Sequence, residues 1–119
     1  MSIKPLRWMG SSLKDLRAFP DDMRYAFGYA LYEAQNGEKP DAAKPLKGFG
    51  SAGVLEVVES GQGGTYRALY TVQFSKAIYV LQCFQKKSIR GIKTSQQDIE
   101  LIKNRLKAAE RDAQENNDA

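Results

Sequence analysis

Arg67, Lys86 and Lys87 are the residues of this sequence whose types and positions best suit chemistry on a phosphate. A guanidinium forms paired hydrogen bonds with phosphate oxygens and stabilises the negative charge that develops there in a transition state. In a pair of adjacent lysines, each positive charge makes it easier for the other to lose its proton, so one of them can accept a proton near neutral pH. The alternatives are a solvated arginine on a strand and a charged strand end that discourages edge pairing.

Other polar residues in the middle of the chain are candidates for binding a polyanion such as RNA. Lysine and arginine number 18 against 14 acidic residues, and this mild excess permits contact with a polyanion without requiring it. Gln82 lies in an apolar run, so it either needs buried hydrogen-bond partners or faces the same side as Arg67. The RNA-binding candidates are Lys44, Lys47, Gln82, Ser88 and Arg90.

Several classes of site are excluded by the residues that are missing. The chain has no histidine and one cysteine, Cys83, so a zinc site and a Ser-His-Asp or Cys-His triad are not expected. We expect no cofactor and no metal. Cys83 lies in an apolar run and is predicted to be a buried, reduced thiol. The glycine-rich piece 61–64 lies between two strand-like runs and lacks the lysine of a phosphate loop, which favours a hairpin turn.

The order of the predicted elements positions these residues. Residues 3–8 are extended, a short helix covers 13–18, and a long helix opens at Asp21 or Asp22 and stops at Asn36-Gly37. A long loop is expected over 38–53. Strands follow at 54–58, 66–74 and 78–84, rich in β-branched and aromatic residues. A loop over 85–94 leads to a final helix with Thr94 or Ser95 as its cap.

These elements predict an α+β domain, a small antiparallel sheet with two N-terminal helices and a C-terminal helix packed on it. The domain is expected to span 1–110, with a flexible tail over 111–119. On strand 66–74 the alternation assigns Tyr66 and Tyr70 to the core and turns Arg67 toward a sheet face that stays open to a partner. The tyrosines of the long helix are expected to pack in the core. The sequence shows no membrane span and no signal-peptide layout, and a cytoplasmic protein is expected.

The ordered set of short motifs resembles the HigB-like, phage-derived branch of the RelE/ParE toxin superfamily. The resemblance covers about residues 4–110. Its pieces are Ser11-Ser12-Leu13-Lys14-Asp15-Leu16, Phe19-Pro20, Gly28-Tyr29-Ala30-Leu31, Ala43-Lys44-Pro45-Leu46-Lys47-Gly48, Val54-Leu55-Glu56-Val57-Val58-Glu59, Thr65-Tyr66-Arg67-Ala68-Leu69-Tyr70, Val80-Leu81, Phe84-Gln85-Lys86-Lys87-Ser88, Asp98-Ile99 and Arg105-Leu106-Lys107. Any one piece is weak, whereas their order and spacing together are fairly specific.

The resemblance implies a RelE-like fold and the toxin of a type II toxin–antitoxin system. It implies cleavage of messenger RNA on the ribosome, and an antitoxin of helix-turn-helix type as partner. Arg67 matches the arginine of the family's Tyr-Arg strand motif, and Lys86 and Lys87 match its paired lysines. This chain has Gln82 where the branch usually has a histidine, so no proton can be exchanged there. A ParE-like inhibitor of DNA gyrase, or an inactivated relative that only binds antitoxin, stays an open alternative.

Overall fold

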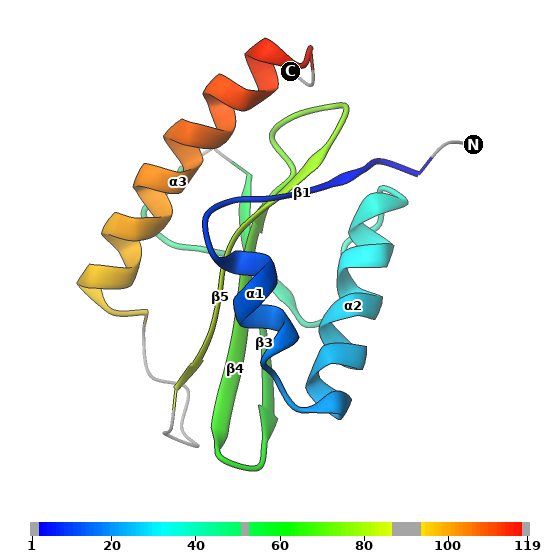
Figure 1. Cartoon of the computed structure of the whole chain (residues 1–119), viewed down its shortest axis with the longest axis vertical. Helices are drawn as coiled ribbons and strands as arrows, with labels where there is room; N and C mark the ends of the chain where they lie inside the picture. Colours follow the sequence, from blue (N-terminus) through cyan, green and yellow to red (C-terminus); the bar gives the residue numbers. More distant parts are fainter. Residues whose placement is uncertain (1–2, 51–52, 87–93, 118–119) are drawn as a thin grey trace.

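The computed structural model describes residues 3–50, 53–86 and 94–117. Its elements in chain order are β1 (Leu6–Trp8), α1 (Ser12–Arg17), α2 (Asp21–Gln35), β2 (Ala43–Pro45), β3 (Val54–Gly61), β4 (Gly64–Thr71), β5 (Ile78–Lys86) and α3 (Gln96–Glu115). The strands form one sheet in the order β1-β5-β4-β3-β2 (Figure 1). β1 runs parallel to β5 and the other pairs are antiparallel. The predicted α+β class is therefore confirmed.

Several of the predicted boundaries are wrong. The strand predicted over 66–74 ends at Thr71, and the one predicted over 54–58 continues to Gly61. Residues 43–45, which were expected to lie in a long loop, form β2 and pair with β3. The expected flexible tail is helical over its first half, because α3 continues to Glu115. Ala113 is completely buried there, and the hydroxyl of Tyr79 donates to Asp112 at 2.8 Å. The chain therefore keeps folding contacts beyond residue 110.

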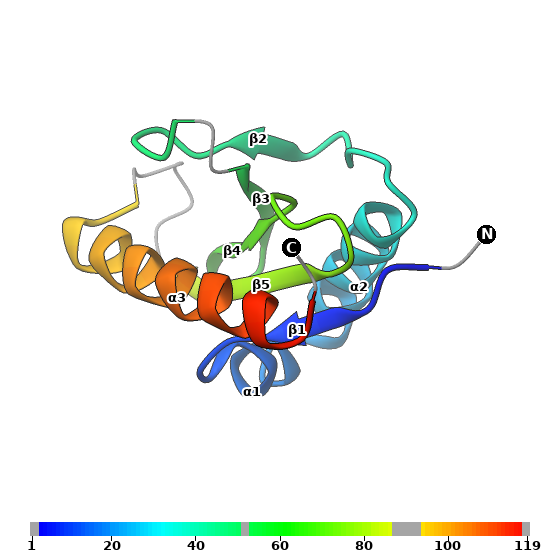
Figure 2. The same ribbon diagram turned by 90° about the horizontal axis from the view of Figure 1, so that it is seen from above.

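The first core lies between one face of the sheet and the two N-terminal helices (Figures 1 and 2). Phe27 and Leu31 of α2 are buried against it. Tyr66 and Tyr70 contribute from β4, which confirms their assignment to the core. The ring of Phe19 meets that of Tyr66 edge-on at 5.0 Å between centroids, a favourable aromatic geometry that fixes the end of α1 on the sheet.

A second core covers part of the opposite face, which was expected to stay open. Leu69, Tyr79 and Leu81 point to this side and pack against Ile102 and Leu106 of α3. The register changes between Leu69, which faces Gln82, and Tyr70, which faces Val80, so Leu81 is an extra residue on β5. Alternation along a single strand assumes a regular register without extra residues. The sequence pattern therefore did not predict that one end of this face is apolar.

In the described ranges, no helix has the length and apolar character needed to cross a membrane.

The tyrosines of α2 do not pack in the core as expected. Tyr25, Tyr29 and Tyr32 all lie on the solvent side of the helix, whereas Phe27 is fully buried. A helix turns 100° per residue, so aromatic side chains at these spacings divide between two faces. Only the phenylalanine falls on the face of Met23 and Leu31 that meets the sheet.

Candidate functional site

The centre of the candidate site is Arg67, in the middle strand of the sheet. Its register partners are Val58 on β3 and Phe84 on β5, so neighbouring strands flank it on both sides. It was expected on an open face, but only 4% of the residue is exposed. Its Nη1 donates to Oε2 of Glu56 at 2.9 Å. Arg67 thus lies on the predicted face, but as a buried member of an ion pair and not as a solvated side chain.

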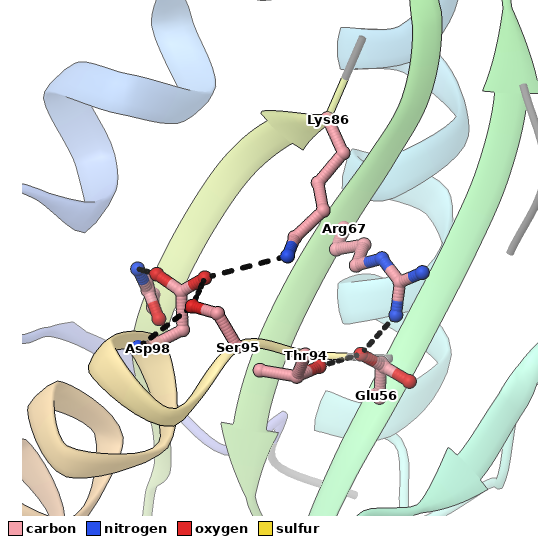
Figure 3. A network of polar contacts seen from close by, with 7 residues as sticks. Glu56, Arg67, Lys86, Thr94, Ser95 and Asp98 are labelled. Carbon is pink, nitrogen blue, oxygen red and sulfur yellow. Dashed lines mark hydrogen bonds and ion pairs between the residues drawn. The ribbon is translucent and has the colours of Figure 1, made fainter. Parts of the chain in front are cut away.

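Glu56 of β3 is a site residue that the sequence analysis missed. Its Oε2 accepts a hydrogen bond from Arg67 and a second, also of 2.9 Å, from Oγ1 of Thr94, just before α3 (Figure 3). Glu56 lies opposite Leu69, two residues along from Val58, the partner of Arg67. Since residues two apart on a strand share a face, this pairing could have been found once the β3–β4 register was known.

Lys86 lies on the same sheet face as Arg67. It pairs with Thr65, two residues before Arg67 on β4. Its Nζ lies 3.7 Å from Oδ2 of Asp98, in the first turn of α3, and 5.8 Å from the centre of the Phe84 ring. Asp98 is the second site residue that was missed, because its position depends on how α3 crosses the sheet.

Asp98 also fixes the start of α3. Its backbone N–H donates to Oγ of Ser95, and that hydroxyl donates to the Asp98 carboxylate at 2.7 Å. Ser95, one of the two residues predicted to cap the helix, is therefore the cap that forms. Gln82 Nε2 donates to Asp98 Oδ1 at 3.0 Å, so Gln82 faces the side of Arg67 but is buried. Its Oε1 has no hydrogen-bond partner among the described residues.

The remaining predicted residues divide into two groups. Lys44 lies on β2 directly opposite Glu56, so its exposed side chain belongs to the same face. Lys47 is exposed in the segment that follows β2. The candidates Lys87, Ser88 and Arg90 lie outside the described residues. The structure therefore brings together Arg67, Lys86, Gln82 and Lys44 on one face.

The prediction of a buried thiol at Cys83 is confirmed. Burial raises the pKa of this thiol to about 12, with a further upward contribution from Asp15 and an opposing one from Arg105. Such a thiol stays protonated and is not a nucleophile at neutral pH. Within the part of the chain that the structure describes, no group of three or more Cys, Asp or Glu side chains is placed to hold a metal ion.

Comparisons with known proteins identify the family and the fold. Residues 14–107 match the family "Phage derived protein Gp49-like (DUF891)". The free Escherichia coli toxin RelE, carrying two arginine-to-alanine changes, has a similar structure with a TM-score of 0.54 and 18% identity, covering 90% of this chain and 98% of RelE. Another crystal structure of isolated E. coli RelE gives a TM-score of 0.51 and 20% identity over 85% of this chain and 97% of RelE.

A chain of the toxin–antitoxin complex RelBE2 from Mycobacterium tuberculosis is also similar, with a TM-score of 0.50 and 21% identity. It covers 71% of this chain and 100% of its own length. No curated protein shows significant sequence similarity. The phage-derived family and the RelE-like fold implied by the resemblance are thus confirmed. The chain belongs to the phage-derived Gp49-like family and has the fold of the RelE toxins.

Proposed function

We propose that this protein is the toxin of a type II toxin–antitoxin system, of the HigB-like branch, and that it cleaves messenger RNA on the ribosome. The observation that carries the proposal is the arrangement of Arg67 and Lys86 on one sheet face, each held by a carboxylate. The Gp49-like family and the RelE fold support it. A partner-binding protein without chemistry would not need cations fixed at the centre of the sheet.

The proposed reaction uses the substrate's own 2′-hydroxyl oxygen, which attacks the adjacent phosphorus while the bond to the 5′-oxygen breaks. Negative charge gathers on the phosphate oxygens in the transition state. The planar guanidinium of Arg67 donates to these oxygens, and the buried setting strengthens each charged hydrogen bond. The side chain of Lys86 is about one-fifth exposed and adds a second positive charge next to the phosphate. Lys44 is exposed and extends the positive surface toward the RNA backbone.

Two proton transfers complete the reaction: the 2′-hydroxyl gives a proton to an acceptor in the site, and the 5′-oxygen takes up a proton as it leaves. Lys86 and Lys87 are the candidate acceptors for the first proton. Glu56, whose carboxylate accepts a hydrogen bond from Arg67, is a further candidate acceptor. Glu56→Gln preserves an oxygen acceptor for Arg67 but removes the carboxylate. If Glu56 accepts the proton, this change should lower kcat by about a hundredfold. An unchanged kcat would assign the acceptor role to a lysine.

The proposed partners are a cognate antitoxin of helix-turn-helix type, messenger RNA and the ribosome. The protein is proposed to act in the cytoplasm and not to bind a membrane. The RelBE2 structure is described as a toxin–antitoxin complex, which supports an antitoxin partner for a protein of this fold. Toxins of this class need a bound inhibitor, because free activity would stop growth of the cell that makes them.

The deciding experiment is expression of this chain alone, followed by primer extension on translated transcripts. New 5′ ends inside reading frames are expected, and Arg67→Ala should abolish them. Intact transcripts with gyrase-dependent DNA breaks would instead support the ParE-like alternative. If growth continues and both nucleic acids stay intact, while the chain still binds the product of the neighbouring gene, the protein is an inactivated relative and the proposal is wrong.

A further inference from the structure

The outer face of α2 carries a row of exposed aromatic side chains. Tyr25, Tyr29 and Tyr32 are 79%, 58% and 51% exposed. Their spacings of four and three residues place them on one side of the helix. The opposite side of α2 is buried in the first core, so the tyrosines have no role in holding the helix to the sheet. Large amphipathic rings at this exposure are typical of protein interfaces.

Gly28 lies within the same row, three residues after Tyr25 and four before Tyr32. A Cβ atom added there would meet nothing within 4 Å, and the backbone does not have the positive φ that favours glycine. Glycine inside a helix costs about 1 kcal/mol of stability relative to alanine. No described residue explains the cost. The missing side chain leaves the helix backbone open at this position of the row, so another backbone can approach it closely.

The net charge of α2 indicates the type of partner. α2 contains three carboxylates, Asp21, Asp22 and Glu33, and one arginine, Arg24, which already pairs with Asp21. This helix is thus acidic in a chain whose net charge is +4. RNA would be repelled by these carboxylates, and a second copy of the chain would present the same acidic helix. A helix with basic residues flanking small apolar ones complements the acidic α2 in charge and leaves room for its exposed tyrosine rings.

We propose that the tyrosine–glycine face, formed by Tyr25, Gly28, Tyr29 and Tyr32, docks a basic amphipathic helix of the antitoxin. This inference rests on the proposed function. α2 lies on the opposite side of the sheet from α3, beside which Arg67 and Lys86 are held (Figures 1 and 3). The antitoxin helix therefore holds the toxin through a surface separate from the cationic site, and binding there requires no break of the Arg67–Glu56 pair.

The test measures binding of the purified product of the neighbouring gene by calorimetry, at low and moderate salt. Gly28→Leu, which adds a bulky side chain to this face while favouring the helix, and Tyr29→Ser should each weaken binding at least tenfold. The matched control is Val72→Ser, which changes a 39% exposed apolar residue elsewhere and should bind like the parent. Asp22→Lys should weaken binding most at low salt, where charge attraction is least screened. Circular dichroism confirms that each variant is folded.

The outcomes separate this inference from the proposed function. If Gly28→Leu and Tyr29→Ser bind as tightly as the parent, the docking surface is wrong while the antitoxin partner stands. If the parent does not bind the product of the neighbouring gene, that product is not its antitoxin and the proposed docking surface is wrong as well. Cleavage of messenger RNA is tested separately, by primer extension. Binding that is lost in the two α2 variants and kept in Val72→Ser supports the surface.

Discussion

Replacing Arg67 by methionine should have a structural cost as well as a catalytic one. The side chains of Arg67 and Glu56 are only 5% and 16% exposed, and 2.9 Å separates their charged atoms. Removing one member of a fully buried ion pair costs about 3–5 kcal/mol, because the other charge is left unpaired. Glu56 keeps its hydrogen bond from Thr94 and some contact with water, so we expect Arg67→Met to lower the free energy of unfolding by about 2 kcal/mol.

The double variant Arg67→Met, Glu56→Leu separates the two costs. Replacing a buried pair by apolar residues of similar size is often neutral, so most of the lost stability should return. Cleavage should not return, since neither variant has the guanidinium. A loss of about a hundredfold or more in cleavage is expected in both, the size of effect produced by removing one donor to the transition state.

Urea unfolding followed by circular dichroism gives the stability, and cleavage of messenger RNA on programmed ribosomes gives the activity. Arg67→Lys is the control, because it retains a charge for Glu56 but not the planar fork, and it should recover only part of the activity. If the double variant is folded and cleaves like the parent, Arg67 is not part of the catalytic machinery. If Arg67→Met unfolds at the same urea concentration as the parent, the ion pair does not stabilise the fold.

Three further changes test other parts of the structure. Lys86→Ala should reduce cleavage about tenfold but alter stability by less than ~1 kcal/mol, because its pair is partly exposed, and the same two assays measure both. Gly10→Ala should destabilise the protein by about 1–2 kcal/mol in urea, since Gly10 has a φ of +54° and its Cβ would lie 2.7 Å from Arg105. Burial raises the pKa values of Cys83 and Tyr70 to about 12, with the charge of Glu33 adding to the effect on Tyr70. Because the unfolded chain loses these protons at lower pH than the folded one, the unfolding free energy should fall from about pH 9 to 12 through Cys83 and from about pH 10 to 12 through Tyr70. The slope is about 1.4 kcal/mol per pH unit for each group, and the fall should be less steep in Cys83→Ala.

Local patterns were enough to predict most of the fold. Turn residues and β-branched runs located the three long strands, and the serine before the last helix indicated its cap. The short strand β2 was not predicted, because three residues between prolines and glycines give no periodic signal and form a strand only through pairing with β3. The extra residue Leu81 was missed for a similar reason, since a register shift depends on two strands at once.

The cations of the candidate site were predictable from the sequence, whereas their counterions were not. Arg67 and Lys86 follow strand motifs that can be read along the chain. Glu56 and Asp98 lie 11 residues before Arg67 and 12 residues after Lys86, and only the sheet register and the crossing of α3 bring them close. The prediction of an open cationic face was wrong, because it used only the charges along the strands. It did not include the carboxylates of Glu56 and Asp98, which come from other segments and pair with these cations.

The pairing of each cation with a carboxylate explains how a cationic site persists inside the sheet of a folded protein. An isolated buried guanidinium would cost several kcal/mol, and Glu56 offsets much of that cost while it fixes the direction of Nη1. The phosphodiester of RNA has two non-bridging oxygens, as a carboxylate does, so in the proposed reaction it takes the place of Glu56 at Arg67 without leaving the guanidinium unpaired. Substrate binding is then an exchange of one anion for another. In such an exchange the displaced carboxylate lies beside the reacting phosphate and close to the 2′-hydroxyl whose proton has to be accepted.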